Sequence, residues 1–103
     1  MTTRTKSAAV KFLEGQAGPL SLGGLLVAIR EGDGASQVEF ARKLGLSRSH
    51  LCDVEKGRKS VSPARAARMA KALGYSQPQF VRLAMQGMLE EAGLKMTVSV
   101  EAA

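Results

Sequence analysis

Residues 36–57 read SQVEFARKLGLSRSHLCDVEKG, and this segment carries the clearest structural signals in the chain. Its first half opens with a capping-box pattern at Ser36, which predicts the start of a helix, and closes at Gly45, the residue type that commonly ends one. Ser47 predicts the cap of a second helix, which stops at Gly57. Because so few residues separate the two helices, the helices must lie at a sharp angle to each other. We therefore expect a helix-turn-helix.

The apolar residues of this stretch recur at the spacing needed for the two helices to share a core, and they are Phe40, Leu44, Leu46, Leu51 and Val54. The opposite side of the second helix carries Arg48, Ser49, Cys52, Asp53 and Lys56. Arginine can pair with guanine and aspartate can accept a hydrogen bond from cytosine, so this side has the chemistry to read a major groove. The alternative is a solvated helix face without a partner.

Outside this stretch, periodicity and punctuation predict three more helices, at about 20–31, 62–74 and 76–92. Residues 1–18 are predicted to be a flexible arm. Residues 19–75 form the predicted helix-turn-helix domain, and residues 76–103 form a predicted dimerisation segment. The expected fold is all-α with five helices.

The end of the chain changes period, because apolar and polar residues alternate over 94–100 as in a β-strand. A lone strand cannot satisfy its own backbone, so we expect it to pair antiparallel with the same strand of a second copy; a disordered tail is the alternative. The last helix carries one apolar face for the core, with Phe80, Leu83, Ala84 and Met88, and a second stripe. The stripe and the strand give the predicted dimer interface: Val81, Met85, Leu89, Leu94, Met96, Val98 and Val100.

Charge points to a polyanionic partner. The chain has 103 residues and a net charge of +6, and the segment 36–71 alone carries nine basic and three acidic residues. Such a concentration favours nucleic acid over a uniformly charged surface. One Cys and one His exclude a disulfide framework and multi-Cys or His-rich metal sites. We expect no metal, cofactor, catalytic residue or membrane span, and a cytoplasmic, nucleoid-associated protein.

With its helix caps, its shared apolar core and its short turn, the segment from Leu22 to Tyr75 resembles the Cro/CI family, also called the XRE-type family. The resemblance implies a lambda-repressor-like domain that binds double-stranded DNA at a palindromic operator. It implies that Gln37 touches phosphate and braces the recognition helix, and that Arg30 and Glu55 form an ion pair. The full expected DNA-binding set is Gln37, Ser47, Arg48, Ser49, His50, Cys52, Asp53, Lys56, Arg58 and Lys59.

The fusion of this domain to SQPQFVRLAMQGMLEEAGLKMTVSVEAA resembles HigA-like and HipB-like antitoxin regulators. This resemblance implies a homodimeric repressor that controls its own operon as the antitoxin of a toxin–antitoxin module, with a toxin protein as partner. The alternative function is a protein-interaction module of the same fold that binds a toxin or another partner without specific DNA recognition.

Overall fold

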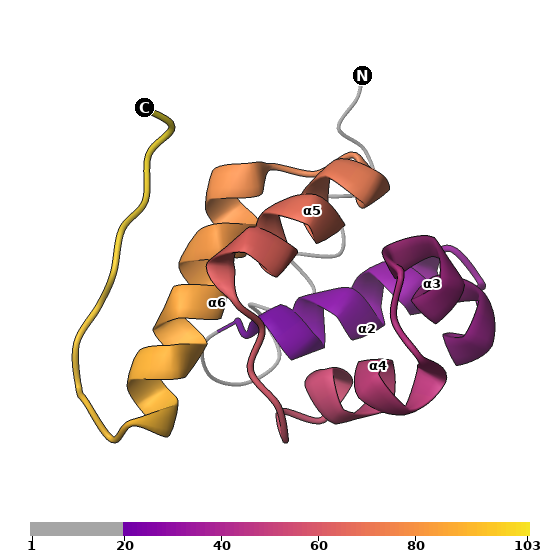
Figure 1. The fold of residues 1–103 in the computed structure, drawn as a ribbon, viewed down its shortest axis with the longest axis horizontal. Helices are drawn as coiled ribbons and strands as arrows, with labels where there is room; N and C mark the ends of the chain where they lie inside the picture. The colour runs from indigo at the N-terminus through magenta and orange to yellow at the C-terminus, as the bar shows by residue number, and fades with distance from the viewer. Residues whose placement is uncertain (1–19) are drawn as a thin grey trace. The chain divides into compact units, whose positions relative to one another are not determined.

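The computed structural model describes residues 20–103, and every regular element in this range is an α-helix (Figure 1). The helices are α2 (Leu22–Gly32), α3 (Gln37–Leu44), α4 (Arg48–Glu55), α5 (Pro63–Leu73) and α6 (Gln77–Glu91). The chain divides into two compact units between Lys59 and Ser60. The arm predicted for residues 1–18 lies outside the described residues.

A serine caps the start of every one of these helices. In each case the serine hydroxyl oxygen accepts a hydrogen bond from a backbone N–H in the first turn; the caps are Ser21, Ser36, Ser47, Ser62 and Ser76. Ser36 and Glu39 form both hydrogen bonds of the predicted capping box, at 3.1 and 3.0 Å. Gly45 and Gly74 end their helices in the left-handed conformation that glycine favours. The sequence signals therefore located the helix ends closely.

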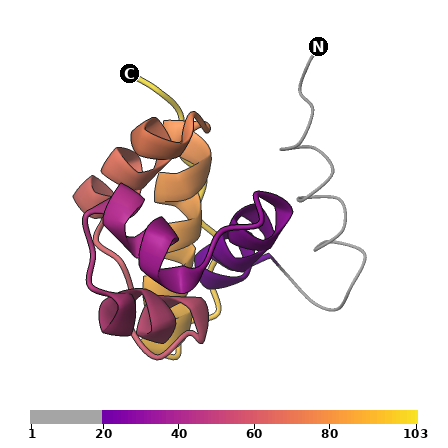
Figure 2. The ribbon, with the colours of Figure 1, turned by 90° about the vertical axis from the view of Figure 1, so that its right-hand side faces the viewer.

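The first unit contains α2, α3 and α4, and both α2 and α3 pack against α4. Figures 1 and 2 show α3 and α4 running in clearly different directions on either side of their short link. Of the residues predicted for the shared core of α3 and α4, three are buried and two, Leu44 and Leu46, are half-buried. The buried ones are Phe40, Leu51 and Val54, and Ala41 of α3 is buried with them. The buried side chains of α2 are Leu22, Leu25, Leu26 and Ile29.

Gly23 lies where α2 meets the backbone at the end of α4. A β-carbon added there would strike the backbone carbonyl oxygen of Val54 and would lie 3.0 Å from that of Glu55. The glycine weakens the first turn of α2, because glycine is a poor helix former. It also allows α2 to approach the backbone at the end of α4.

The second unit pairs α5 with α6. Phe80, Leu83 and Ala84 of α6 are buried, as predicted, but Met88 is 42% exposed, so its expected place in the core is wrong. The physical reason is length: α6 has 15 residues against 11 in α5. It returns obliquely across α5, and its last turn extends past the start of α5 (Figure 1).

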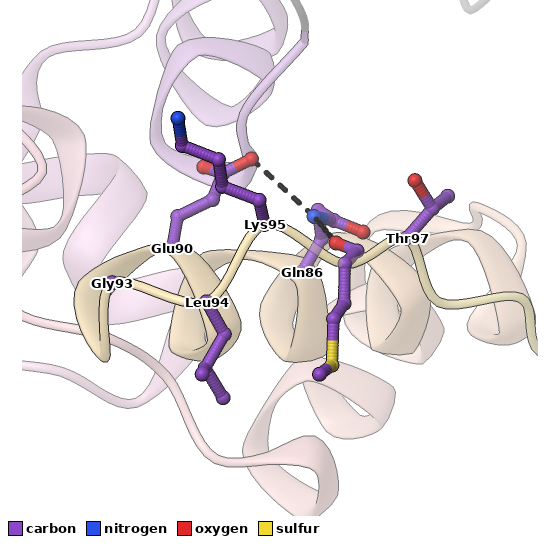
Figure 3. A pocket seen from close by; sticks show the side chains of 7 residues that line it. Gln86, Glu90, Gly93, Leu94, Lys95 and Thr97 are labelled. Atoms are coloured by element: carbon purple, nitrogen blue, oxygen red, sulfur yellow. Dashed lines mark hydrogen bonds between the residues drawn. The ribbon is translucent and has the colours of Figure 1, made fainter.

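The predicted strand at 94–100 is not formed in the single chain, where residues 94–103 belong to neither a helix nor a strand. The segment turns back along α6, and the side chain of Gln86 takes the place of a neighbouring strand (Figure 3). Its amide nitrogen donates to the carbonyl of Met96 at 2.8 Å, and its oxygen accepts from the N–H of Val98 at 3.0 Å. A strand needs a partner strand, and residues 20–103 offer none.

Candidate nucleic-acid interface

The link between α3 and α4 sets the direction of the candidate recognition helix. Gly45 adopts φ 73°, and the N–H of Leu46 reaches back to the carbonyl of Ala41 at 2.9 Å. Ser47 then accepts from the N–H of His50 at 3.0 Å and starts α4. The hydroxyl oxygen of Ser47, a predicted DNA contact, is thus taken up by the cap, while its O–H remains able to donate to a phosphate.

The two sides of α4 differ as the periodicity predicts. Leu51 and Val54 are buried, with 0% and 3% of their surface exposed. The opposite side is accessible in the single chain: Arg48, Ser49 and Lys56 are exposed, and His50, Cys52 and Asp53 are half-buried. Among residues 20–103, the candidate reading face is therefore not covered by other parts of the fold.

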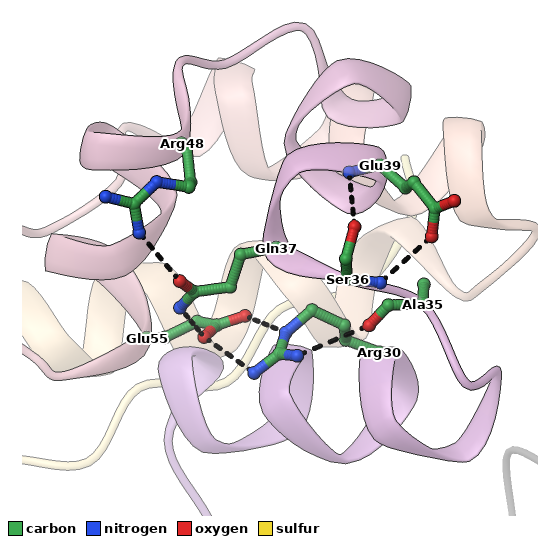
Figure 4. A network of polar contacts seen from close by, with 7 residues as sticks. All are labelled: Arg30, Ala35, Ser36, Gln37, Glu39, Arg48 and Glu55. Carbon is green, nitrogen blue, oxygen red and sulfur yellow. Dashed lines mark hydrogen bonds and ion pairs between the residues drawn. The ribbon is translucent and has the colours of Figure 1, made fainter.

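A partly buried ion pair lies behind this face. The guanidinium of Arg30 on α2 donates to both carboxylate oxygens of Glu55 at the end of α4, at 2.8 and 3.2 Å, and to the carbonyl of Ala35 at 3.3 Å (Figure 4). The side chain of Glu55 is only 4% exposed and that of Arg30 16%. The hydrogen bond with Glu55 raises the pKa of Arg30 above its ordinary value. The pair joins α2 to α4 through both charge attraction and hydrogen bonds.

Gln37 extends this pair to the reading face. Its amide nitrogen donates to Glu55 at 2.9 Å, and its amide oxygen accepts from Arg48 at 3.2 Å. Since Glu55 can only accept, the Gln37 amide has one favourable orientation, with its oxygen toward Arg48. Figure 4 shows the rest of the Arg48 guanidinium directed away from Gln37. A run of four side chains, Arg30–Glu55–Gln37–Arg48, thus positions the first residue of α4.

The basic loop that follows α4 is attached to Asp53. Its carboxylate lies 3.1 Å from Nε of Arg58 and 3.8 Å from Nζ of Lys59. Its backbone carbonyl also accepts from the N–H groups of both residues, at 2.8 and 3.3 Å. Gly57, at φ 76°, allows the sharp reversal that brings the loop back. Sequence reasoning gave Asp53 a role in reading bases and missed its pairing with these two cations.

The residues of the predicted dimer interface all lie in the second unit. Val81, Met85, Leu89, Val98 and Val100 are half-buried, whereas Leu94 and Met96 are exposed. Within residues 20–103, no three His, Cys, Asp or Glu side chains gather closely enough to hold a metal ion. Nor does any helix in that range have the length and apolar character required to cross a bilayer.

Comparison with known proteins agrees with this geometry. Residues 21–83 match the family model described as a helix-turn-helix domain. The chain is also similar to a solved structure whose title is "Crystal Structure of hypothetical transcription factor NHTF from Neisseria". The two are 33% identical, the match covers 68% of this chain and 79% of that one, and the TM-score is 0.52. Among curated proteins, no match to this chain was found.

Proposed function

Because the chain belongs to the helix-turn-helix domain family, we propose that it is a sequence-specific DNA-binding transcriptional regulator that reads a major groove with α4. The observation that carries the proposal is the alignment of Arg48. This side chain is exposed at the start of α4 and donates to the amide oxygen of Gln37, whose amide nitrogen in turn donates to the carboxylate of Glu55. A reading residue held in position loses less conformational entropy on binding, and arginine is the commonest reader of guanine.

Within this proposal, some residues of the interface contact the DNA bases and others contact the DNA backbone. Arg48 and Ser49, at the exposed start of α4, contact base edges, and Cys52 lies further along the same face. Ser47 caps the start of the helix, His50 lies in its first turn, and Gln37 lies beside its first residue. Lys56, Arg58 and Lys59 follow its end and contact phosphates, which position a protein on the duplex without reading its sequence.

The regulator acts, we propose, as a homodimeric repressor on a palindromic operator. Repression requires only occupancy, because a protein bound across a promoter excludes other proteins. Dimerisation is supported by the second unit, where Met88, Leu94 and Met96 expose apolar surface along α6 and the tail. Gln86 occupies the edge of the tail formed by Met96 and Val98.

The opposite edge of the tail is suited to a second copy. Along an extended chain, successive residues direct their backbone groups to opposite edges. Thr97 therefore faces away from the edge that Gln86 occupies, and its backbone makes no hydrogen bond within residues 20–103. The same segment of a second copy, running antiparallel, would satisfy Thr97 and cover the neighbouring apolar side chains.

The test is selection of bound duplexes from a random pool by the purified chain. We expect two inverted half-sites separated by about one helical turn, or about 10 base pairs. Arg48→Ala should weaken binding to the selected duplex by about 1–3 kcal/mol and relax the preference at one base position. Arg42→Ala is the matched control, because it removes an equal charge from an exposed position on α3.

Other outcomes would contradict parts of the proposal. If Arg48→Ala and Arg42→Ala weaken binding equally, α4 is not the reading helix. A chain that selects no duplex, remains monomeric and captures a second polypeptide such as a toxin through α6 and the tail would favour the interaction-module alternative.

A further inference from the structure

Asp53 is the one carboxylate among the polar side chains of the α4 reading face, in a segment that is otherwise strongly basic. Its side chain is 28% exposed, so it is accessible from solvent. An acid facing a duplex is repelled by the phosphates unless something neutralises it. What neutralises it in this chain are the two cations that follow the helix, Arg58 and Lys59.

We propose that Asp53 is an internal competitor for DNA phosphate, which occupies Arg58 and Lys59 in the free chain and lowers the affinity of the loop for any duplex. This inference rests on the proposed DNA binding and names a residue that sets its strength. In its contacts the carboxylate resembles a phosphate: one oxygen accepts from the Arg58 guanidinium at 3.1 Å, and the other lies 3.8 Å from the Lys59 ammonium as an ion pair.

The contacts are of a kind that can be exchanged. The side chains of Arg58 and Lys59 are 59% and 61% exposed, and ion pairs between exposed side chains are weak. By contrast, the backbone of the loop is held to the carbonyl of Asp53 by two hydrogen bonds that no side-chain substitution removes. The loop can therefore keep its course while its two cations turn from the carboxylate to the DNA backbone.

The role of Asp53 should be visible in the dependence of binding on salt. Cations that are already paired release fewer counterions when DNA binds. Arg58, Lys59 and Asp53 together carry one net positive charge, whereas Asp53→Asn leaves two. Since each neutralised phosphate contributes about 0.9 to the slope of log affinity against log salt, Asp53→Asn should steepen that slope by about one unit.

The experiment measures affinity for a random-sequence duplex over a range of salt concentrations, with the full chain. We expect Asp53→Asn to bind more tightly at low salt, with the steeper slope, and Asp53→Glu to resemble the unaltered chain. Asp33→Asn is the matched control, because it makes the same change in net charge at an exposed position in the turn after α2. Thermal unfolding of each variant verifies that all are folded.

A coupled variant separates pairing from charge alone. In a chain that already carries Arg58→Gln and Lys59→Gln, adding Asp53→Asn should change the slope no more than Asp33→Asn does. The inference is overturned if Asp53→Asn binds more weakly than the unaltered chain, or if its slope equals that of Asp33→Asn. Those two outcomes would overturn this inference alone, since the unaltered chain still binds DNA. An unaltered chain that binds no duplex would overturn the proposed function as well.

Discussion

Replacing Gly23 with alanine is expected to destabilise the first unit, although alanine is the better helix former. The added β-carbon would strike the carbonyl oxygen of Val54 and approach that of Glu55, at 3.0 Å. Both are backbone atoms at the end of α4 and cannot rotate away as a flexible side chain would. To admit the methyl group, α2 and α4 must separate, which disturbs the ion pair between Arg30 and Glu55 at the same crossing.

The magnitude follows from two opposing effects. Overpacking a tight contact costs about 1–3 kcal/mol, and the higher helix propensity of alanine returns about 1 kcal/mol. We expect Gly23→Ala to lower the free energy of unfolding by up to about 2 kcal/mol, a large part of the total stability of a small domain. Such a loss lowers the melting temperature by several degrees.

The assay is urea unfolding followed by circular dichroism, with Gly87→Ala as the control. Gly87 lies inside α6, and an added β-carbon there meets no atom within 4 Å. Only the propensity effect applies, so Gly87→Ala should stabilise the protein by about 0.5–1 kcal/mol. The two glycine-to-alanine changes thus have opposite expected signs. A Gly23→Ala variant stabilised as much as Gly87→Ala would refute the argument that backbone contact limits this position.

Two further predictions follow from the hydrogen-bond networks. Arg30→Ala leaves the buried carboxylate of Glu55 without its cation and should lower the free energy of unfolding by about 3–5 kcal/mol in urea, whereas Arg58→Ala, which breaks an exposed pair, should lower it by less than about 1 kcal/mol. Equal losses would contradict the burial argument. Gln86→Ala removes both hydrogen bonds that hold the tail, so the amide proton of Val98 should exchange with solvent at the rate of an unprotected amide, while Glu90→Gln leaves its protection in place. Continued protection of Val98 in Gln86→Ala would mean that another contact holds the tail.

The sequence predicted most accurately those features that local chemistry determines. Ser36 and Ser62 cap helices, and Gly45 and Gly74 end them, because each acts on backbone groups within a few residues. The apolar spacing likewise identified Phe40, Leu51 and Val54 as buried. These local signals are sufficient to predict a helix-turn-helix from the amino-acid sequence alone.

The features that sequence reasoning missed depend on contacts between distant parts of the chain. The residue type alone shows that Gly23 lowers the helix propensity of α2. That it permits close contact with α4 depends on where the two helices meet. Met88 has the spacing of a core residue and is exposed because α5 is too short to cover it. The pairing of Asp53 depends on a loop reversal at Gly57, which brings Arg58 and Lys59 back toward the helix that they follow.

The single orientation of the Gln37 amide has a consequence for anyone who would retarget this protein to a new DNA sequence. The amide nitrogen of Gln37 faces the carboxylate of Glu55, so its oxygen faces position 48 and favours a hydrogen-bond donor there. A Gln37→Glu exchange would place a second negative charge beside that of Glu55. Libraries of variants with altered DNA preference should therefore vary Ser49 and Cys52 independently, and should vary positions 37 and 48 only together.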